Sequence, residues 1–132
     1  MIDYLGVGDL LALHAELMGR LGRWPSPLVD EDGLVAELQR PQAAAHFEQA
    51  DLIRQAAILA VRLAQLRPFV DGNLPTSFAA MESFLGLNGF AVDPGRAVDL
   101  VRSLHLMAEE RDPDEATDRF ERCLRPSVIP AD

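Results

Sequence analysis

The chain has 132 residues, of which 48% are hydrophobic and 25% charged, and its formal net charge is −9. This length and balance predict one globular domain over residues 1–132 and exclude a disordered tail. A surface this acidic repels phosphate backbones, no apolar run is long enough to cross a bilayer, and no signal peptide opens the chain. We therefore expect a cytoplasmic protein that binds neither nucleic acid nor membrane.

The first predicted helix runs from about Asp9, a suitable N-cap, to Leu21. Its apolar residues recur at helical spacing and form one stripe of Leu10, Leu13, Leu17 and Leu21. Two prolines within residues 23–27 exclude a helix there, so a loop follows. Trp24 lies in this loop, and we expect it to fill the core from there, with a partner surface as the alternative.

Acidic residues at positions 30–32 predict the start of a second helix, because the helix dipole favours negative charge there. Its short apolar face is supplied by Leu34, Val35 and Leu38. We expect Pro41 to end this helix. The third helix, from about Ala50 to Leu66, is apolar over so much of its surface that it is expected at the centre of the fold, and Pro68 ends it.

The fourth helix is predicted to start near Leu74 or Pro75 and to end at Asn88-Gly89, a C-terminal signal. Asp93-Pro94 then predicts the N-cap and first residue of a fifth helix that reaches about Glu110. The expected inner face of this fifth helix consists of Val98, Val101, Leu104, His105 and Ala108.

Asp112-Pro113 predicts the start of the last helix in the same way, and Pro126 ends it, leaving a loose tail over residues 127–132. The single cysteine, Cys123, excludes an internal disulfide and a cysteine-based metal cluster. Its helical spacing from Phe120 predicts a small core residue. No segment alternates like a strand, so the expected fold class is all-α, a single compact bundle of about six helices.

The stretch Arg67–Thr76 between the third and fourth helices carries the strongest local signal for a site. Gly72 allows a positive φ, and Asn73 is expected to cap the following helix. The unpaired N–H groups at that helix start would then face outward as an anion site. A turn with a helix cap that needs no ligand explains the same residues, and both interpretations remain open.

This stretch resembles the signature loop of the Fic and death-on-curing (Doc) proteins, His-x-Phe-x-Asp/Glu-Gly-Asn-x-Arg. The positions that fit its common form are Pro68, Phe69, Asp71, Gly72, Asn73 and Thr76. Three further segments, 4–14, 32–42 and 84–90, are similar to other parts of death-on-curing relatives. The resemblance covers about the first two-thirds of the chain and implies a helical Fic/Doc-like domain.

The resemblance also implies a chemistry for the loop. In the family, the histidine is a general base, the acid holds a metal ion on nucleotide phosphates, and the arginine binds phosphate. Fic members transfer AMP, and death-on-curing toxins transfer a phosphate to a translation elongation factor. Carried over by position, Asp71 would bind Mg²⁺, while Gly72, Asn73, Leu74 and Pro75 would contact the phosphates of ATP.

Three positions depart from the family pattern: the histidine is replaced by Arg67, the usual Lys or Gly by Leu74, and the phosphate-binding Arg by Pro75. A guanidinium stays protonated and accepts no hydrogen bond, so Arg67 cannot act as a base. Losing a general base costs a factor on the order of 10²–10⁴ in rate. Leu74 offers no charge, and Pro75 removes a guanidinium and an N–H from the anion site.

The residues and the resemblance together lead to two main hypotheses for the function. The first is a degenerate Doc/Fic-like protein of toxin–antitoxin type that is catalytically silent, needs no cofactor and binds an antitoxin-like peptide, a protein partner or a family target such as an elongation factor. The second is an active nucleotide-dependent transferase with a relocated base, for which Glu82 is a candidate. A helical scaffold without a ligand is a third option. His14, His46 and His105 have no metal-binding spacing and are expected as helix-face or partly buried residues.

Overall fold

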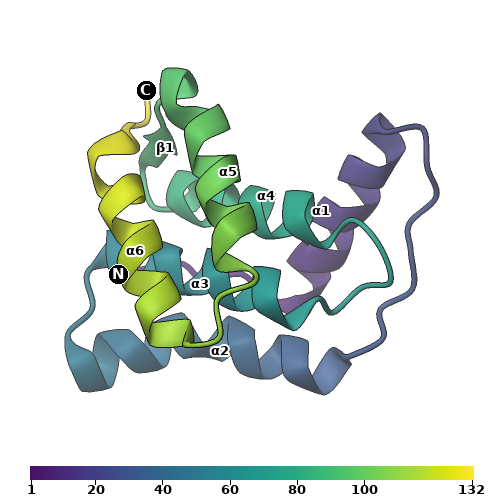
Figure 1. Ribbon diagram of the computed structural model, residues 1–132, viewed down its shortest axis with the longest axis horizontal. Coiled ribbons are helices and arrows are strands. Elements are labelled where there is room, and N and C mark those ends of the chain that lie inside the picture. The colour runs from purple at the N-terminus through teal and green to yellow at the C-terminus, as the bar shows by residue number, and fades with distance from the viewer.

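Helix α3 (Leu52–Leu66) lies at the centre of the computed structural model, which describes residues 1–132 (Figure 1). Nine of its fifteen residues are buried, and five of those nine are alanine or valine. Such small side chains allow neighbouring helices to approach closely. Asp51 caps the helix by accepting the N–H of Arg54 at 2.9 Å. The predicted central helix is therefore confirmed.

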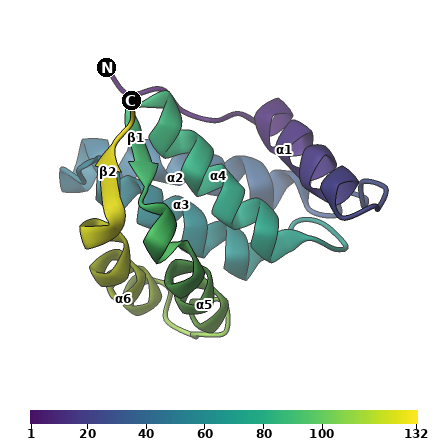
Figure 2. The same cartoon turned by 90° about the horizontal axis from the view of Figure 1, so that it is seen from above.

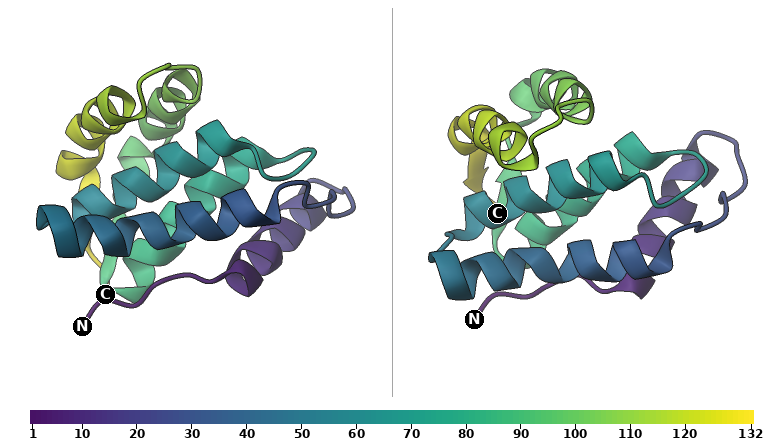
Figure 3. Two further views of the ribbon diagram at one scale, coloured as in Figure 1. Left: turned by 90° about the horizontal axis from the view of Figure 1, so that it is seen from below. Right: turned by 60° about the horizontal axis from the view of Figure 1, so that its bottom comes forward.

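The other five helices surround α3. Helices α2 (Glu31–Glu48) and α4 (Asn73–Leu87) lie along it, as Figure 3 shows. Helices α5 (Ala97–Met107) and α6 (Pro113–Leu124) pack against each other and both contact α3, and Figure 2 shows this pair on one side of the molecule. Helix α1 (Val7–Arg20) packs mainly on α4, at the opposite end. The fold is the expected all-α bundle of six helices.

The C-terminal segment is ordered, which corrects the expectation of a loose tail. After a short 3₁₀ turn, η2 (Arg125–Ser127), strand β2 (Val128–Pro130) pairs antiparallel with β1 (Phe90–Val92). The pairing is extended at both ends, by Asp93 N–H to Ser127 O at 2.7 Å and Ala131 N–H to Gly89 O at 3.0 Å. Three-residue strands are too short to show an alternating pattern, so the sequence gives no signal for them.

Helix α2 continues through Pro41 and ends at Glu48, so the prediction that Pro41 stops it is wrong. The ring leaves the carbonyl of Glu37 without its usual N–H partner. Pro41 is buried, however, and it lies on the same face as the buried Leu34, Leu38 and Ala44, which packs against α3. Burial of this continuous face offsets the lost hydrogen bond.

The face of α5 was also predicted incorrectly. Asp93-Pro94 starts a 3₁₀ turn, η1 (Pro94–Arg96), instead of the helix itself, and α5 follows from Ala97. The buried residues are Leu100, Leu104 and Met107. Val98 and Val101 are exposed by 64% and 36%, and His105 is exposed as well. This leaves an apolar surface on α5 that no other helix covers.

Smaller corrections concern single residues. Gly6 is the N-cap of α1, and Asp9 lies in its first turn and accepts the Gly6 N–H at 2.8 Å. Leu21 is exposed by 59%, Trp24 by 90%, and Cys123 is an exposed free thiol, so none of them belongs to the core. None of the helices has the length and apolar character that a bilayer-spanning segment needs.

Candidate functional site

The loop between α3 and α4 is fixed internally by Asn73. Its Oδ1 accepts the N–H of Phe69 at 2.9 Å, and its Nδ2 donates to the Phe69 carbonyl at 2.7 Å. Asn73 is the first residue of α4, and Gly72 is the N-cap, with φ of 75° and no side-chain cap bond. The prediction that Asn73 caps the helix is therefore wrong. Its amide instead pairs with both main-chain groups of Phe69, as a neighbouring strand would.

A second segment holds the loop from its other side. Leu28 and Phe69 form an antiparallel bridge. It is flanked by hydrogen bonds from Val29 N–H to Pro68 O at 2.8 Å and from Val70 N–H to Pro27 O at 3.1 Å. The loop between α1 and α2 thus lies directly against the loop between α3 and α4.

The side chain of His14, on α1, contacts both of these loops. Its ring stacks on Phe69, with centroids 3.8 Å apart and planes 4° from parallel. Nδ1 lies 3.0 Å from Thr76 Oγ1, and Nε2 lies 3.0 Å from Ser26 Oγ and accepts the Ser26 N–H at 3.2 Å. The side chain is 1% exposed, and burial lowers the pKa of His14, while the charge of Asp71 raises it to a smaller extent.

The sequence interpretation missed this role of His14. A signal was present, because His14 lies four residues after Leu10 and four before Met18, and all three are buried on one face of α1. Gly72 shows how closely the loop approaches this face. A Cβ on Gly72 would lie 2.8 Å from Met18 Sδ and 3.1 Å from His14 Cε1. Only glycine fits both this space and the positive φ.

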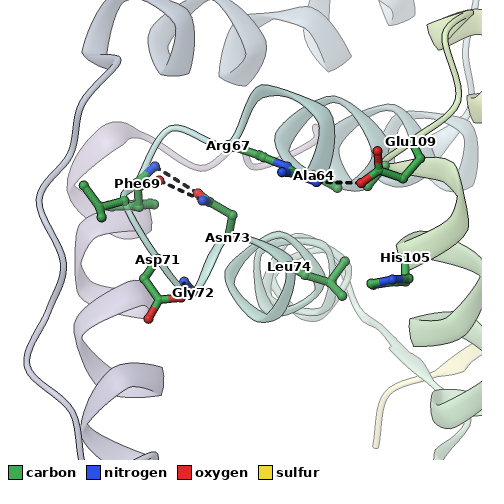
Figure 4. Close-up of a pocket in the computed structure, with 11 residues that line it drawn as sticks. Ala64, Arg67, Phe69, Asp71, Gly72, Asn73, Leu74, His105 and Glu109 are labelled. Atoms are coloured by element: carbon green, nitrogen blue, oxygen red, sulfur yellow. Dashed lines mark hydrogen bonds and ion pairs between the residues drawn. The ribbon is translucent and has the colours of Figure 1, made fainter.

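A hollow of about 370 Å³ opens beside the loop, between α3, α4 and α5. Figure 4 shows Leu74 and His105 facing each other across it, and Arg67 reaching towards Glu109. Arg67 ends α3 in a left-handed conformation with φ of 53°, and its Nη2 lies 2.7 Å from Glu109 Oε1. The residue at the family's histidine position therefore forms an ion pair at the rim of this hollow.

Two further hollows meet the first one at Leu74. One, of about 250 Å³, is lined by Leu17, Leu74, Pro75, Phe78, Ala79, Glu82 and Val101. The other, of about 410 Å³, is lined by Leu74, Val101, Arg102, His105 and Leu106. We call these three neighbouring hollows, which share Leu74 in their lining, the Leu74 groove. Glu82 and Arg102 form no ion pair within the chain, and desolvation raises the pKa of Glu82.

The surroundings of Asp71 do not fit a Mg²⁺ ion. Its Oδ1 accepts the Gly72 N–H at 2.8 Å, and its Oδ2 pairs with the guanidinium of Arg23. The carboxylate points towards α1, away from Leu74 and His105 (Figure 4). No three His, Cys, Asp or Glu side chains come together anywhere in the chain as a metal-binding group. One carboxylate that already pairs with a guanidinium and stands without a second protein ligand is a poor site for Mg²⁺.

The predicted phosphate-binding residues come together at the start of α4, but their donors are few. Gly72, Asn73 and Leu74 line the first hollow, whereas Pro75 lines the second. The Gly72 N–H is bound to Asp71, Pro75 has none, and the Thr76 N–H bonds to the Gly72 carbonyl at 3.1 Å. A triphosphate needs several converging donors or cations, and the bond to Asp71, the proline and the bond to the Gly72 carbonyl remove three of them at this helix start.

A protein-family model described as the Fic/DOC family matches residues 4–85, which is more than half of the chain. The matched segment contains α1 to α3, all but the last two residues of α4, and the loop fixed by Asn73 and His14. No curated protein matches the chain. On the strength of the family match, the chain belongs to the Fic/DOC family.

Proposed function

We propose that this chain is a degenerate, Doc-like member of the family, of toxin–antitoxin type, which is catalytically silent and acts by binding a protein or peptide partner. The position of Leu74 is the main support for this proposal. This residue stands where the resembled loop has Lys or Gly, and it lies where three surface hollows meet. The change turns the phosphate side of the loop into an apolar surface.

The loss of chemistry supports the silent part of the proposal. Arg67 cannot accept a proton, and its guanidinium is held by Glu109 at 2.7 Å. Pro75 has neither a charge nor an N–H to offer a phosphate. Charge-assisted hydrogen bonds are worth roughly 1.5–3 kcal/mol each, so these losses weaken triphosphate binding by several kcal/mol.

The groove supports the binding part of the proposal and defines the chemistry of the partner. Its second and third hollows are mostly apolar, and Leu106 on the α5 side is exposed by 65%. Glu82 stands on the α4 side and Arg102 on the α5 side, both without an ion-pair partner. An amphipathic, antitoxin-like segment fits this surface if its apolar residues are flanked by a basic residue near Glu82 and an acidic one near Arg102.

A displayed peptide library tests the groove. Peptides are selected on the wild-type chain, and their affinities are then measured by calorimetry for wild type, Leu74→Lys and Phe47→Lys. Phe47 is a matched control because it is 76% exposed and lies on α2, away from the groove. We expect selected peptides that bind Leu74→Lys at least about tenfold more weakly, with Phe47→Lys unchanged. If the selected peptides bind Leu74→Lys as tightly as the wild type, the proposed site is wrong.

A separate experiment tests silence. The chain is incubated with ATP, Mg²⁺ and an elongation factor, and the factor is examined by mass spectrometry for a phosphoryl or AMP group. We expect no modification by the wild type. The variant Arg67→His/Leu74→Lys/Pro75→Arg restores the family residues and is expected to bind nucleotide, because it returns a base, a second cation and a guanidinium to the loop. Any modification of the factor by the wild type would defeat the silent interpretation.

The second candidate function, an active transferase with a relocated base, has one observation in its favour. The pKa of Glu82 is raised by desolvation, which moves its carboxylate towards the range of a general base. Glu82 lines the second hollow, whereas Arg67 and Asp71 line the first. Calorimetric titration with ATP, ADP and CTP distinguishes the two functions, since this candidate requires binding at millimolar concentration and the silent binder does not.

A further inference from the structure

A second hollow region lies between α2, α3 and α6, and it shares no lining residue with the Leu74 groove. Its volume is about 240 Å³, and three of its eight lining residues are arginines: Arg40 of α2, and Arg54 and Arg62 of α3. The last two are the only charged residues of the central helix, and both line this hollow. We call it the arginine hollow. A chain with a net charge of −9 thus places three of its twelve basic side chains around one cavity.

One end of the arginine hollow has no positive charge to spare. Arg54 Nη1 lies 2.6 Å from Asp118 Oδ1 and 3.2 Å from Glu121 Oε1, so two carboxylates of α6 already balance this guanidinium. Glu48, the last residue of α2, also lines the hollow and adds a further negative charge. An anion is therefore not expected to bind beside Arg54.

Arg62 differs from Arg54 because it donates to no carboxylate at hydrogen-bond distance. Its one ion pair is with Asp114, whose Oδ1 lies 3.7 Å from Arg62 Nη2. The side chain of Arg62 is 21% exposed, whereas that of Asp114 is 86% exposed. A contact this long to so exposed a carboxylate contributes little stabilisation. The guanidinium of Arg62 is thus largely shielded from water without a closely bound anion.

Arg40 lies at the same end of the hollow as Arg62. It donates through Nε at 2.9 Å and through Nη2 at 3.2 Å to Glu37, which leaves its Nη1 without a partner. The pKa of Arg40 is raised, first by the hydrogen bond to Glu37 and also by the charge of Asp114. Asp114 therefore lies near both Arg40 and Arg62, and two guanidiniums from neighbouring helices share one exposed carboxylate.

We propose that Arg40 and Arg62 form a binding site for a phosphate group, and that the ligand displaces the carboxylate of Asp114 from the edge of this site. The N–H groups of a guanidinium form a fork that matches the oxygens of a phosphate. A divalent phosphate can accept from guanidiniums on both helices, which the distant carboxylate does not do. The buried side chains of Ala44 and Ile58 give the hollow an apolar part, so a small phosphate monoester fits it as well as inorganic phosphate.

A titration followed by NMR tests this site. Inorganic phosphate is added to the ¹⁵N-labelled protein at pH 7, with sodium chloride exchanged for it so that the ionic strength stays constant. We expect saturable shifts of the amide and arginine Nε–H signals of Arg40 and Arg62. Ethyl phosphate is titrated in the same way, and tighter binding of it identifies a monoester as the ligand, whereas equal binding identifies free phosphate. Shifts that do not saturate, or that spread over all arginines, would show general screening and overturn the proposal.

Three variants separate a binding site from a surface ion pair. Arg62→Gln should weaken phosphate binding about tenfold or more, because charge-assisted hydrogen bonds are lost. Arg122→Gln should bind like the wild type, because Arg122 is an exposed arginine of α6 that does not line the hollow. Asp114→Asn should tighten phosphate binding about fivefold, the value of one exposed ion pair, because it removes the competing charge.

The Asp114→Asn variant keeps the test decisive if Arg62→Gln does not fold, because the side chain of Asp114 is exposed. Unchanged or weaker phosphate binding by Asp114→Asn would overturn the proposal, as would unchanged binding by a folded Arg62→Gln. Since the arginine hollow shares no residue with the Leu74 groove, the result is independent of whether that groove binds a partner.

Discussion

Replacement of Gly72 by alanine separates backbone strain from crowding, because the chain contains a matched control. Gly72 and Gly89 both have positive φ, of 75° and 88°. A Cβ at Gly89 meets no atom within 4 Å, whereas one at Gly72 lies 2.8 Å from Met18 Sδ and 3.1 Å from His14 Cε1. Gly89→Ala therefore measures the left-handed backbone alone. Gly72→Ala measures the same backbone cost together with displacement of α1 side chains.

The left-handed backbone costs an alanine about 1–2 kcal/mol, and forcing a methyl group into a packed contact adds about 1–3 kcal/mol. We expect Gly89→Ala to lower the free energy of unfolding by about 1 kcal/mol, and Gly72→Ala to lower it by about 3 kcal/mol. Urea melts followed by circular dichroism measure both values. Equal losses in the two variants would show that the loop does not press against His14 and Met18, and the description of the site would then be wrong.

Three more predictions concern the same structure. Asn73→Ala removes both bonds to the Phe69 main chain, so we expect the free energy of unfolding in urea melts to fall by about 2 kcal/mol. The isosteric Asn73→Asp should keep the bond from the Phe69 N–H but lose the one to its carbonyl. Hydrogen bonding to Arg125 is the largest of several causes that lower the pKa of Asp51. The ionised Asp51 therefore stabilises the fold above pH 3.8, and this stabilisation is lost as the pH falls through the lower pKa of the folded state. The difference in Tm between wild type and Arg125→Ala should accordingly shrink below pH 4. Cys123→Ser should change the free energy of unfolding by less than about 0.5 kcal/mol, because the thiol is exposed, and a larger loss would place it in the core after all.

The sequence predicted the helices well where a cap and an apolar face agree. Asp112 before α6 accepts two N–H groups of the first turn, and Gly89 follows α4 with positive φ. Each of these signals is local, because the bond is made within a few residues of the residue that makes it. Local signals of this kind need no distant partner, which is why they can be predicted from the sequence.

The failures arose where tertiary contacts outweigh a local preference. Pro41 is a strong helix breaker by itself, yet burial of its ring beside Leu38 and Ala44 keeps α2 continuous. On α5, Val98 and Val101 recur at helical spacing with Leu104 and were therefore assigned to the core, yet both are exposed. The spacing of apolar residues is the same whether their side chains face a surface groove or the core, so periodicity alone could not distinguish the two.

The structure places Arg67–Thr76 in and beside one loop between α3 and α4, as expected, but the contacts within this stretch were not predictable. Asn73 could either cap a helix or bond back to Phe69, and only the loop geometry decides between them. His14 lies 62 residues from Thr76, so no spacing rule connects them. The sequence indicated only that Arg67 cannot act as a base. Its ion pair with Glu109, 42 residues further along the chain, could not be predicted because the position of that segment was unknown.

The position of α3 has a consequence for how the protein is made. This helix is buried from every side, and its cover includes α5 and α6, which follow it by more than 30 residues along the chain. During synthesis, its apolar surface therefore stays open to water until residues 97–124 have left the ribosome. Strand β2 can pair with β1 only after that, so the last third of the chain completes the fold.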